Sequence, residues 1–187
     1  MKYYSQVFDF VEIDSSFYRP PNLFMTKRWA SLTPDYFKFA AKFPRSITHE
    51  RRLAGPDKEL HYLFDVMGPL RRKILALLLQ LPPSPTAKEE SLKKLESLIH
   101  MLDPDFRYAI EVRHKSWFDN KNFYRLLSDN NVCLVWSQLD TIHTPAELTS
   151  DLVYLRFIGD RSIDEKDFGK IQKDRISELK VWSEFVE

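Results

Sequence analysis

Cysteine is almost absent from this chain, whose 187 residues include only Cys133. A disulfide framework is therefore excluded, and the apolar run at 132–136 is typical of a buried thiol rather than a reactive one. Long apolar runs are missing too. The longest, residues 74–79, is far shorter than the ~20 residues that cross a bilayer, and the first residues lack a signal-peptide core. We therefore expect a cytoplasmic protein without membrane contact.

Glycine is also scarce, with four residues in the whole chain. No P-loop, glycine-rich dinucleotide turn or zinc-ribbon spacing is present, so any anion would be held mainly by Lys and Arg side chains or by helix N-termini. The formal net charge is +1, with no excess of either sign. This balance excludes the broad basic surface of a protein that coats nucleic acid, although it leaves room for a local basic patch.

What the chain does contain is a regular alternation of strand-like and helix-like segments. With 43% hydrophobic residues, residues 1–187 are long enough to form one domain with its own core. Strands are predicted at residues 7–13, 37–43, 74–81, 108–113, 132–136 and 153–158. Helices are predicted at 60–70, at 92–102 behind a capping box at Thr86–Glu89, around 123–127, and from about Asp167 to the end, with an apolar stripe of Phe168, Ile171, Leu179, Trp182 and Val186. Such alternation predicts a parallel sheet with right-handed crossovers.

The two faces of the strands favour a barrel over a doubly wound sheet. One face of each strand is apolar, whereas a doubly wound sheet is covered on both faces and has nearly continuous apolar strands. A barrel has a helix-packed outside and a lumen that accepts polar side chains. The predicted lumen set is Glu12, Asp14, Lys38, Lys42, Gln80, Glu111, Arg113 and Arg156. Buried charges of this kind should pair with one another, with a ligand, or with both.

Six segments resemble one known family in both order and spacing. They are VEIDSSFY (11–18), FKFAAKFP (37–44), ITHER (47–51), LQLPPS (79–84), AIEVRHKSWF (109–118) and VYLRF (153–157). Together they resemble the YecE-like family, domain of unknown function 72, over nearly the whole chain. The resemblance implies a TIM-barrel-like fold and leaves the activity open, since the activity of the family is not established.

The chain departs from the family pattern at both ends. Members open with a strand that carries a Gly/Ser/Gly/Trp-type turn and close with a strand that ends in an Asn-rich segment, and neither feature is found here. We therefore expect about six of the eight β/α units, either because the sequence is truncated or because the barrel is incomplete. Its outer strands, residues 7–13 and 153–158, should be open sheet edges, which would favour homo-oligomerisation.

Chemistry in TIM barrels lies at the carboxyl ends of the strands, where side chains of several strands converge. The predicted catalytic residues are Glu111, His49, Arg113 and His114, and the predicted substrate-binding residues are Glu12, Asp14, Tyr18, Lys42, Gln80, Trp117 and Arg156. Glu111 with Arg113 also fits a structural ion pair. Each histidine is suited to proton transfer near neutral pH or to a loop-anchoring hydrogen bond. Tyr18 and Trp117 fit either stacking on a sugar or base, or loop packing.

The sequence leaves the reaction open. A metal would draw on Glu12, Asp14, Glu111, His49 and His114, but no local ligand spacing names a metal or another cofactor. Arg45, Arg51 and Arg52 fit either a phosphate contact or a solvated loop. Three functions remain: an enzyme for a small anionic or phosphorylated substrate, a metal-dependent phosphodiesterase-like protein that acts on nucleic acid, and a non-catalytic binding module.

Overall fold

The structure, a computed structural model, describes residues 1–139, 142–159, 169 and 173–186. Its strands are β1 (Phe10–Ile13), β2 (Lys38–Lys42), β3 (Ile74–Gln80), β4 (Tyr108–Glu111), β5 (Cys133–Leu134), β6 (Trp136–Gln138) and β7 (Leu155–Phe157). Its α-helices are α1 (Ser15–Tyr18), α2 (Leu23–Leu32), α3 (Asp57–Met67), α4 (Glu89–Ile99), α5 (Lys121–Asp129) and α6 (Ile176–Ser183). The 3-10 turns η1 (Tyr4–Gln6), η3 (Gly68–Lys73) and η4 (Lys115–Trp117) and a π-helical turn, η2 (Ser46–Glu50), complete the set.

All strand pairings between these elements are parallel. One sheet has the order β1-β2-β3-β4-β5, and β6 pairs with β7 in a second sheet. The chain passes from one sheet to the other at Val135, whose backbone N donates to Ile110 O at 2.9 Å, while Trp136 N donates to Tyr154 O at 3.0 Å. The predicted parallel α/β fold is confirmed, and the strand predicted at 132–136 is divided because its two halves pair with different neighbours.

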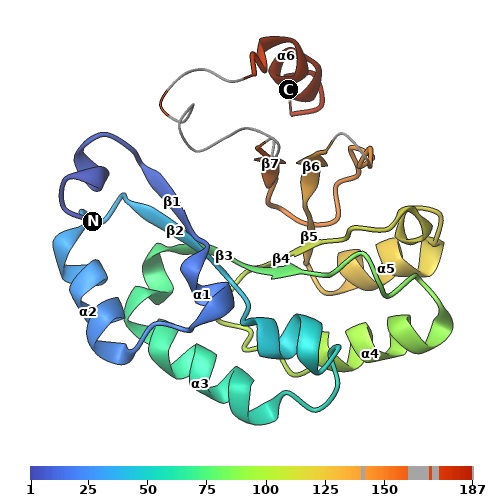
Figure 1. Cartoon of the computed structure of the whole chain (residues 1–187), viewed down its shortest axis with the longest axis horizontal. Helices are drawn as coiled ribbons and strands as arrows, with labels where there is room; N and C mark the ends of the chain where they lie inside the picture. The colour runs from blue at the N-terminus through green and yellow to red at the C-terminus, as the bar shows by residue number, and fades with distance from the viewer. Residues whose placement is uncertain (140–141, 160–168, 170–172, 187) are drawn as a thin grey trace.

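The strand array curls back on itself. Five strand spacings of ~4.8 Å would separate β1 from β7 by about 24 Å in a flat sheet. Arg156 of β7 nevertheless donates to Glu12 of β1 from Nε at 2.9 Å and from Nη2 at 2.6 Å. Helices α2 to α5 lie on one side of the five-stranded sheet, and β6 and β7 lie on the other (Figure 1). The side chains of β1 and β7 therefore meet on the inner, helix-free face.

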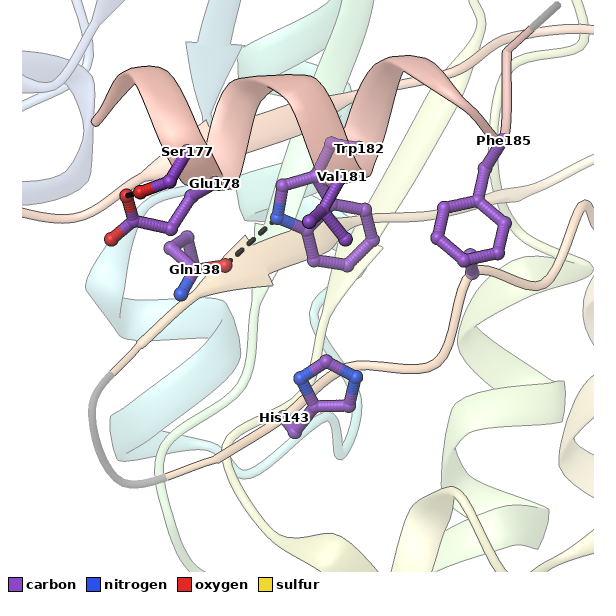
Figure 2. A pocket seen from close by; sticks show the side chains of 8 residues that line it. Gln138, His143, Ser177, Glu178, Val181, Trp182 and Phe185 are labelled. Atoms are coloured by element: carbon purple, nitrogen blue, oxygen red, sulfur yellow. Dashed lines mark hydrogen bonds between the residues drawn. The ribbon is translucent and has the colours of Figure 1, made fainter.

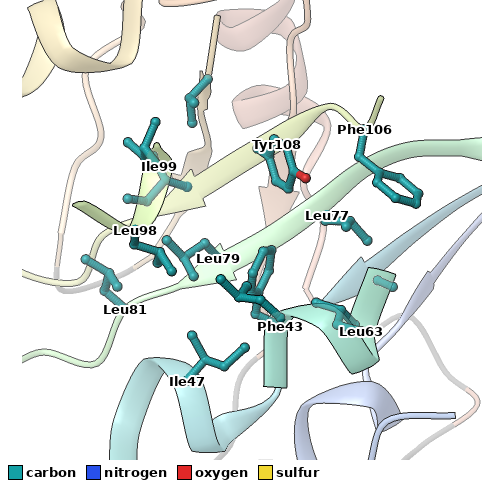
Figure 3. Packing of buried hydrophobic residues seen from close by; sticks show 14 of the residues in the cluster. Phe43, Ile47, Leu63, Leu77, Leu79, Leu81, Leu98, Ile99, Phe106 and Tyr108 are labelled. Atoms are coloured by element: carbon teal, nitrogen blue, oxygen red, sulfur yellow. The ribbon is translucent and has the colours of Figure 1, made fainter. Parts of the chain in front are cut away.

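The hydrophobic core lies on the helix side of the sheet. Phe43, Leu77, Leu79 and Tyr108 pack there against the helices, as Figure 3 shows. A smaller buried cluster on the inner face consists of Ala76, Leu78, Ala109, Cys133 and Val135. The burial predicted for Cys133 is confirmed, and it raises the pKa of the thiol to about 11, so the thiol stays protonated near neutral pH.

Two details of the predicted helices are wrong. Helix α4 begins after Lys88 without a side-chain cap, and Thr86 contributes only its backbone carbonyl, which accepts from Lys88 N at 2.8 Å. The last predicted helix is interrupted, because residues 173–175 are not helical and α6 starts at Ile176, where Asp174 Oδ1 accepts from the backbone N; Asp167 lies outside the described residues.

The apolar stripe predicted for the last helix is borne out only at Trp182, which is buried. Leu179 and Val186 are exposed, and Phe168 and Ile171 lie outside the described residues. Helices α1 and α2 were not predicted, although Asn22 caps α2 by accepting from Met25 N at 2.9 Å. No helix in the described part of the chain is long and apolar enough to cross a membrane.

Strands β1 and β7 are the outer strands of the paired array within the described residues, as predicted. Val7 and Phe8, just before β1, are largely exposed. Because an edge strand with apolar neighbours favours pairing with another chain, we expect self-association. Sedimentation velocity over a range of protein concentrations tests this expectation, and a monomer at every concentration would contradict it.

A buried lysine fixes the end of α2. Lys73 Nζ donates to Ala30 O at 2.8 Å and to Thr33 O at 2.7 Å. We expect Lys73→Met to lower the free energy of unfolding by about 2 kcal/mol, because two buried carbonyl groups lose their donor. Urea denaturation measures this change, with Lys58→Met on the exposed face of α3 as the control. Equal stabilities of the two variants would contradict the role of Lys73.

Candidate functional site

Six charged side chains form a continuous chain of ion pairs on the inner face of the sheet. In order of contact, this charge chain consists of Arg113, Glu111, Arg156, Glu12, Lys42 and Asp14. Its members stand on β1, β2, β4 and β7 or directly after these strands, at their carboxyl ends. The structure thus brings together six of the eleven residues that the sequence suggested for a site.

Glu111 is the centre of the charge chain and is fully buried. One of its oxygens accepts from Nε and Nη2 of Arg113, and the other accepts from Nη1 of Arg156. Both guanidinium groups thereby compensate the cost of burying the carboxylate. Gln80 lies beside Glu111 in the register of β3 and β4, and its side-chain amide has no hydrogen-bond partner among the described residues.

Arg156 connects the charge chain to β1 by donating two hydrogen bonds to Glu12. Burial disfavours its charged form, but the carboxylates of Glu111 and Glu12 outweigh burial and raise the pKa of Arg156. Tyr154 also donates its hydroxyl to Glu12. Burial and the Glu12 carboxylate raise the pKa of Tyr154, so its phenol stays protonated and remains a donor.

Sequence reasoning did not include Tyr154 among the site residues. A usable signal was present, because Tyr154 precedes Arg156 by two residues and therefore shares its face of the strand. The alternating pattern of residues 153–158 by itself indicates only that Tyr154 belongs to a strand-like segment.

The outer end of the charge chain reaches solvent. Lys42 Nζ lies 2.5 Å from Asp14 Oδ1 and 3.7 Å from Glu12 Oε1, and the Asp14 side chain is 68% exposed. Burial raises the pKa of Asp14, but the hydrogen bond and charge of Lys42 outweigh it, and the net effect lowers the pKa. Ser16 fixes this end by donating to the carbonyl groups of Ile13 at 2.7 Å and Lys42 at 2.9 Å.

The charge chain alternates in sign and is neutral as a whole, so it offers no excess of positive charge. Spare hydrogen-bond donors remain at its inner end. A guanidinium has five N–H groups, and Arg113 uses only those on Nε and Nη2 among the described residues. Together with the amide of Gln80, Arg113 can therefore donate to an oxygen-rich ligand.

The loop after β2 carries His49 in the turn η2. Its Nδ1 lies 2.7 Å from Thr48 Oγ1, and its ring packs edge-on against Phe17 with 5.0 Å between centroids. Burial and the nearby Arg45 charge lower the pKa of His49, so the imidazole is neutral near pH 7. Tyr18 is 79% exposed and packs against the same Phe17 ring. His49 and Tyr18 thus both pack against Phe17 of α1, and neither is a member of the charge chain.

Two predicted site residues, Trp117 and His114, make packing and loop contacts. Trp117 is fully buried in the helix-side core and donates Nε1 to Pro85 O at 3.0 Å, so its ring faces are not available for stacking on a ligand. His114 caps the turn η4, with Nδ1 accepting from Ser116 N at 3.2 Å. The contacts of Trp117 match the loop-packing alternative, and those of His114 match the loop-anchoring alternative.

The donors suggested for a metal do not converge. Among the described residues, no three His, Cys, Asp or Glu side chains form a group that could hold a metal ion, because Glu12, Asp14 and Glu111 face cations instead.

The basic loop after β2 is ion-paired as well, with Arg51 2.8 Å from Glu59 and Arg45 3.6 Å from Glu50. Lys38, predicted for the lumen, lies at the amino end of β2 and donates to Arg72 O at 3.2 Å. It therefore does not belong to the strand-end cluster.

A hollow of about 310 Å³ lies beneath α6. It is lined by Gln138, His143, Val181, Trp182 and Phe185, among others, and Trp182 Nε1 donates to Gln138 Oε1 at 2.8 Å (Figure 2). None of the charge chain residues is among those that line it. It belongs to the packing of α6 on the outer face of β6.

The family model described as protein of unknown function DUF72 matches residues 1–187, and the chain belongs to this family. The resemblance identified from the six sequence segments is therefore confirmed.

Individual relatives support the same assignment. UPF0759 protein YecE of Escherichia coli is 34% identical over 118 residues, which are 62% of this chain and 42% of YecE. UPF0759 protein YunF of Bacillus subtilis is 30% identical over 131 residues, 67% of this chain and 46% of YunF. The match thus spans less than half the length of each relative.

Two solved structures share the fold. A DUF72 family protein from Enterococcus faecalis superposes with a TM-score of 0.82 at 24% identity, covering 99% of this chain and 79% of that protein. A DUF72 family protein from Thermotoga maritima gives a TM-score of 0.80 at 26% identity, covering 99% and 75%.

The environment of His49 predicts a pH effect on stability. Its folded-state pKa is lowered, so the stability linked to the neutral ring is fully present above the unfolded-state pKa of about 6.5 and is lost as pH falls through the folded value. We expect the free energy of unfolding to fall less between about pH 7.5 and 5.5 in His49→Gln than in the unaltered chain. Urea denaturation at both pH values measures this difference, and equal losses would contradict it.

Proposed function

We propose that residues 1–187 form one TIM-barrel-like domain, an incomplete barrel, that binds a small anionic or phosphorylated substrate at the carboxyl ends of its strands. The observation that carries this proposal is the charge chain, which gathers buried charges of β1, β2, β4 and β7 at one end of a curled parallel array. In barrels of this type, ligands bind at that end. The curl that brings Arg156 to Glu12 supports the barrel-like geometry.

We infer that the chain is an enzyme in which binding and proton transfer fall to different residues. Arg113 and Gln80 have spare donors for an anionic group. Lys42 and Arg156 neutralise the neighbouring carboxylates of Glu12 and Glu111. Both oxygens of Glu111 already accept hydrogen bonds, so the carboxylate is better suited to holding the cations in place. The neutral ring of His49 is the better acceptor for a proton, and Tyr18, which packs on the same Phe17, offers an exposed ring.

The nucleic-acid alternative has less support. A nucleic-acid phosphodiesterase would need a metal site and a basic loop that is free to contact phosphate. Among the described residues, the carboxylates suggested as metal ligands are paired with cations, and Arg45 and Arg51 are paired with carboxylates. A non-catalytic binding module would use the same strand-end site. Turnover of a bound compound would separate that module from the enzyme.

Arg113 offers the sharpest test. Glu111 is a poorer probe, because its removal would leave two buried guanidiniums without their carboxylate and would cost about 3–5 kcal/mol of stability. Arg113→Met leaves Glu111 paired with Arg156. We expect the unaltered chain to bind inorganic phosphate in isothermal titration at fixed ionic strength, and Arg113→Met to bind it about tenfold more weakly, as the loss of a charged hydrogen bond predicts.

Arg107→Met is the matched control. Arg107 lies just before the same strand, at its amino end, and pairs with Asp151 on the surface at 2.6 Å. Phosphate binding by this control should equal that of the unaltered chain. Equal binding by Arg113→Met, at unchanged thermal stability, would contradict the proposed site. A screen of phosphorylated metabolites for turnover would then identify the substrate of a confirmed site.

A further inference from the structure

Ser137, in the middle of β6, has a buried hydroxyl without a partner. The residue is 1% exposed, and its Oγ makes no hydrogen bond within the described residues. Its backbone is well held, because Ser137 N donates to Thr144 Oγ1 at 3.3 Å and Thr144 Oγ1 donates to Ser137 O at 3.4 Å. Since nearly all buried polar atoms in folded proteins are paired, an orphan hydroxyl on a fixed backbone requires an explanation.

The hydroxyl is on the inner face of β6. The two neighbours of Ser137 point outward, where Trp136 stacks on Trp182 of α6 and Gln138 accepts from the same indole. Alternation therefore turns Ser137 toward the inner face. Its register partner on β7 is Arg156, a central member of the charge chain.

A second guanidinium is linked to Ser137 through its register partner. Arg156 donates to one oxygen of Glu111, and Arg113 donates to the other. The hydroxyl of Ser137 therefore belongs to the same inner-face group of polar side chains as the spare donors of Arg113.

We propose that Ser137 is a ligand-binding residue of the strand-end site, and that its hydroxyl donates to an oxyanion, a carboxylate or phosphate group, held beside Arg113. This inference rests on the proposed function and adds a residue that specifies the ligand. The surrounding groups indicate the ligand class, because guanidinium and amide N–H groups require acceptors.

The hydroxyl also discriminates between anions. Ser137 approaches from β6, whereas Arg113 follows β4 and Gln80 ends β3, so the donors come from three different strands. A group with several oxygens can accept from all of them at once, whereas a single halide ion cannot. The site is therefore specific for an oxyanion and not merely attractive to negative charge.

Ser137→Ala tests the proposal, because it removes only the hydroxyl. We expect its melting temperature without ligand to equal or exceed that of the unaltered chain, since no hydrogen bond is lost. We expect its affinity for inorganic phosphate, or for acetate in a parallel titration, to fall about tenfold. Ser97→Ala, on the exposed face of α4, is the control and should bind as the unaltered chain does.

The outcomes separate the two proposals. If the unaltered chain binds neither phosphate nor acetate, both the proposed function and the role of Ser137 fail. If Arg113→Met loses binding while Ser137→Ala keeps it, the site stands and the role of Ser137 is overturned. A lower melting temperature of Ser137→Ala with unchanged affinity would also overturn it, because the hydroxyl would then be structural. Weaker binding to only one of the two anions supports the proposal and assigns the ligand to that class.

Discussion

The contact between Arg156 and its two carboxylates is the constraint on which the rest of the inner face depends. A single guanidinium reaches Glu12 on the first strand and Glu111 on the fourth, and so it ties together strands that a flat sheet would hold far apart. The curl of the array, the meeting of strand ends and the position of Tyr154 all follow from this contact. Without Arg156, two carboxylates would remain on the inner face with one cation each.

Alternation of sign makes such a buried cluster tolerable. Each carboxylate in the charge chain touches a cation on at least one side, so the cost of removing these groups from water is offset locally. The same neutrality limits what the cluster can do to a distant ligand, because it creates no long-range field. Recognition must therefore come from short-range donors, and these lie at the inner end, where Arg113 and Gln80 keep N–H groups that have no partner among the residues described.

The fold and the charge chain were predictable from the sequence because both follow from a period of two. Glu12, Lys42, Glu111 and Arg156 oppose apolar neighbours in their strands, and a one-residue slip in register would have buried them among the helices. The two alternatives for Trp117 could not be separated, because a motif that ends in an aromatic residue does not say which layer receives the ring. Tyr154 shares the strand face of Arg156, but that parity alone does not show that its hydroxyl reaches Glu12. Ser137 was missed because a small hydroxyl in a strand carries no pattern, and only the partners across the sheet show its surroundings.

The two ends of the strands differ in how fully their polar groups are satisfied. At the amino end, Lys73 donates hydrogen bonds to two carbonyl groups at the end of α2, and Arg107 pairs with Asp151. At the carboxyl end, the Ser137 hydroxyl has no hydrogen-bond partner within the part of the chain that the structure describes, and Arg52 and Leu53 hold positive φ angles of 48° and 68° in the loop after β2. Both features disfavour the folded chain on its own. Both features lie at the end of the strands that also carries the spare donors. A ligand site needs polar groups without protein partners, because only such groups can form hydrogen bonds with the ligand.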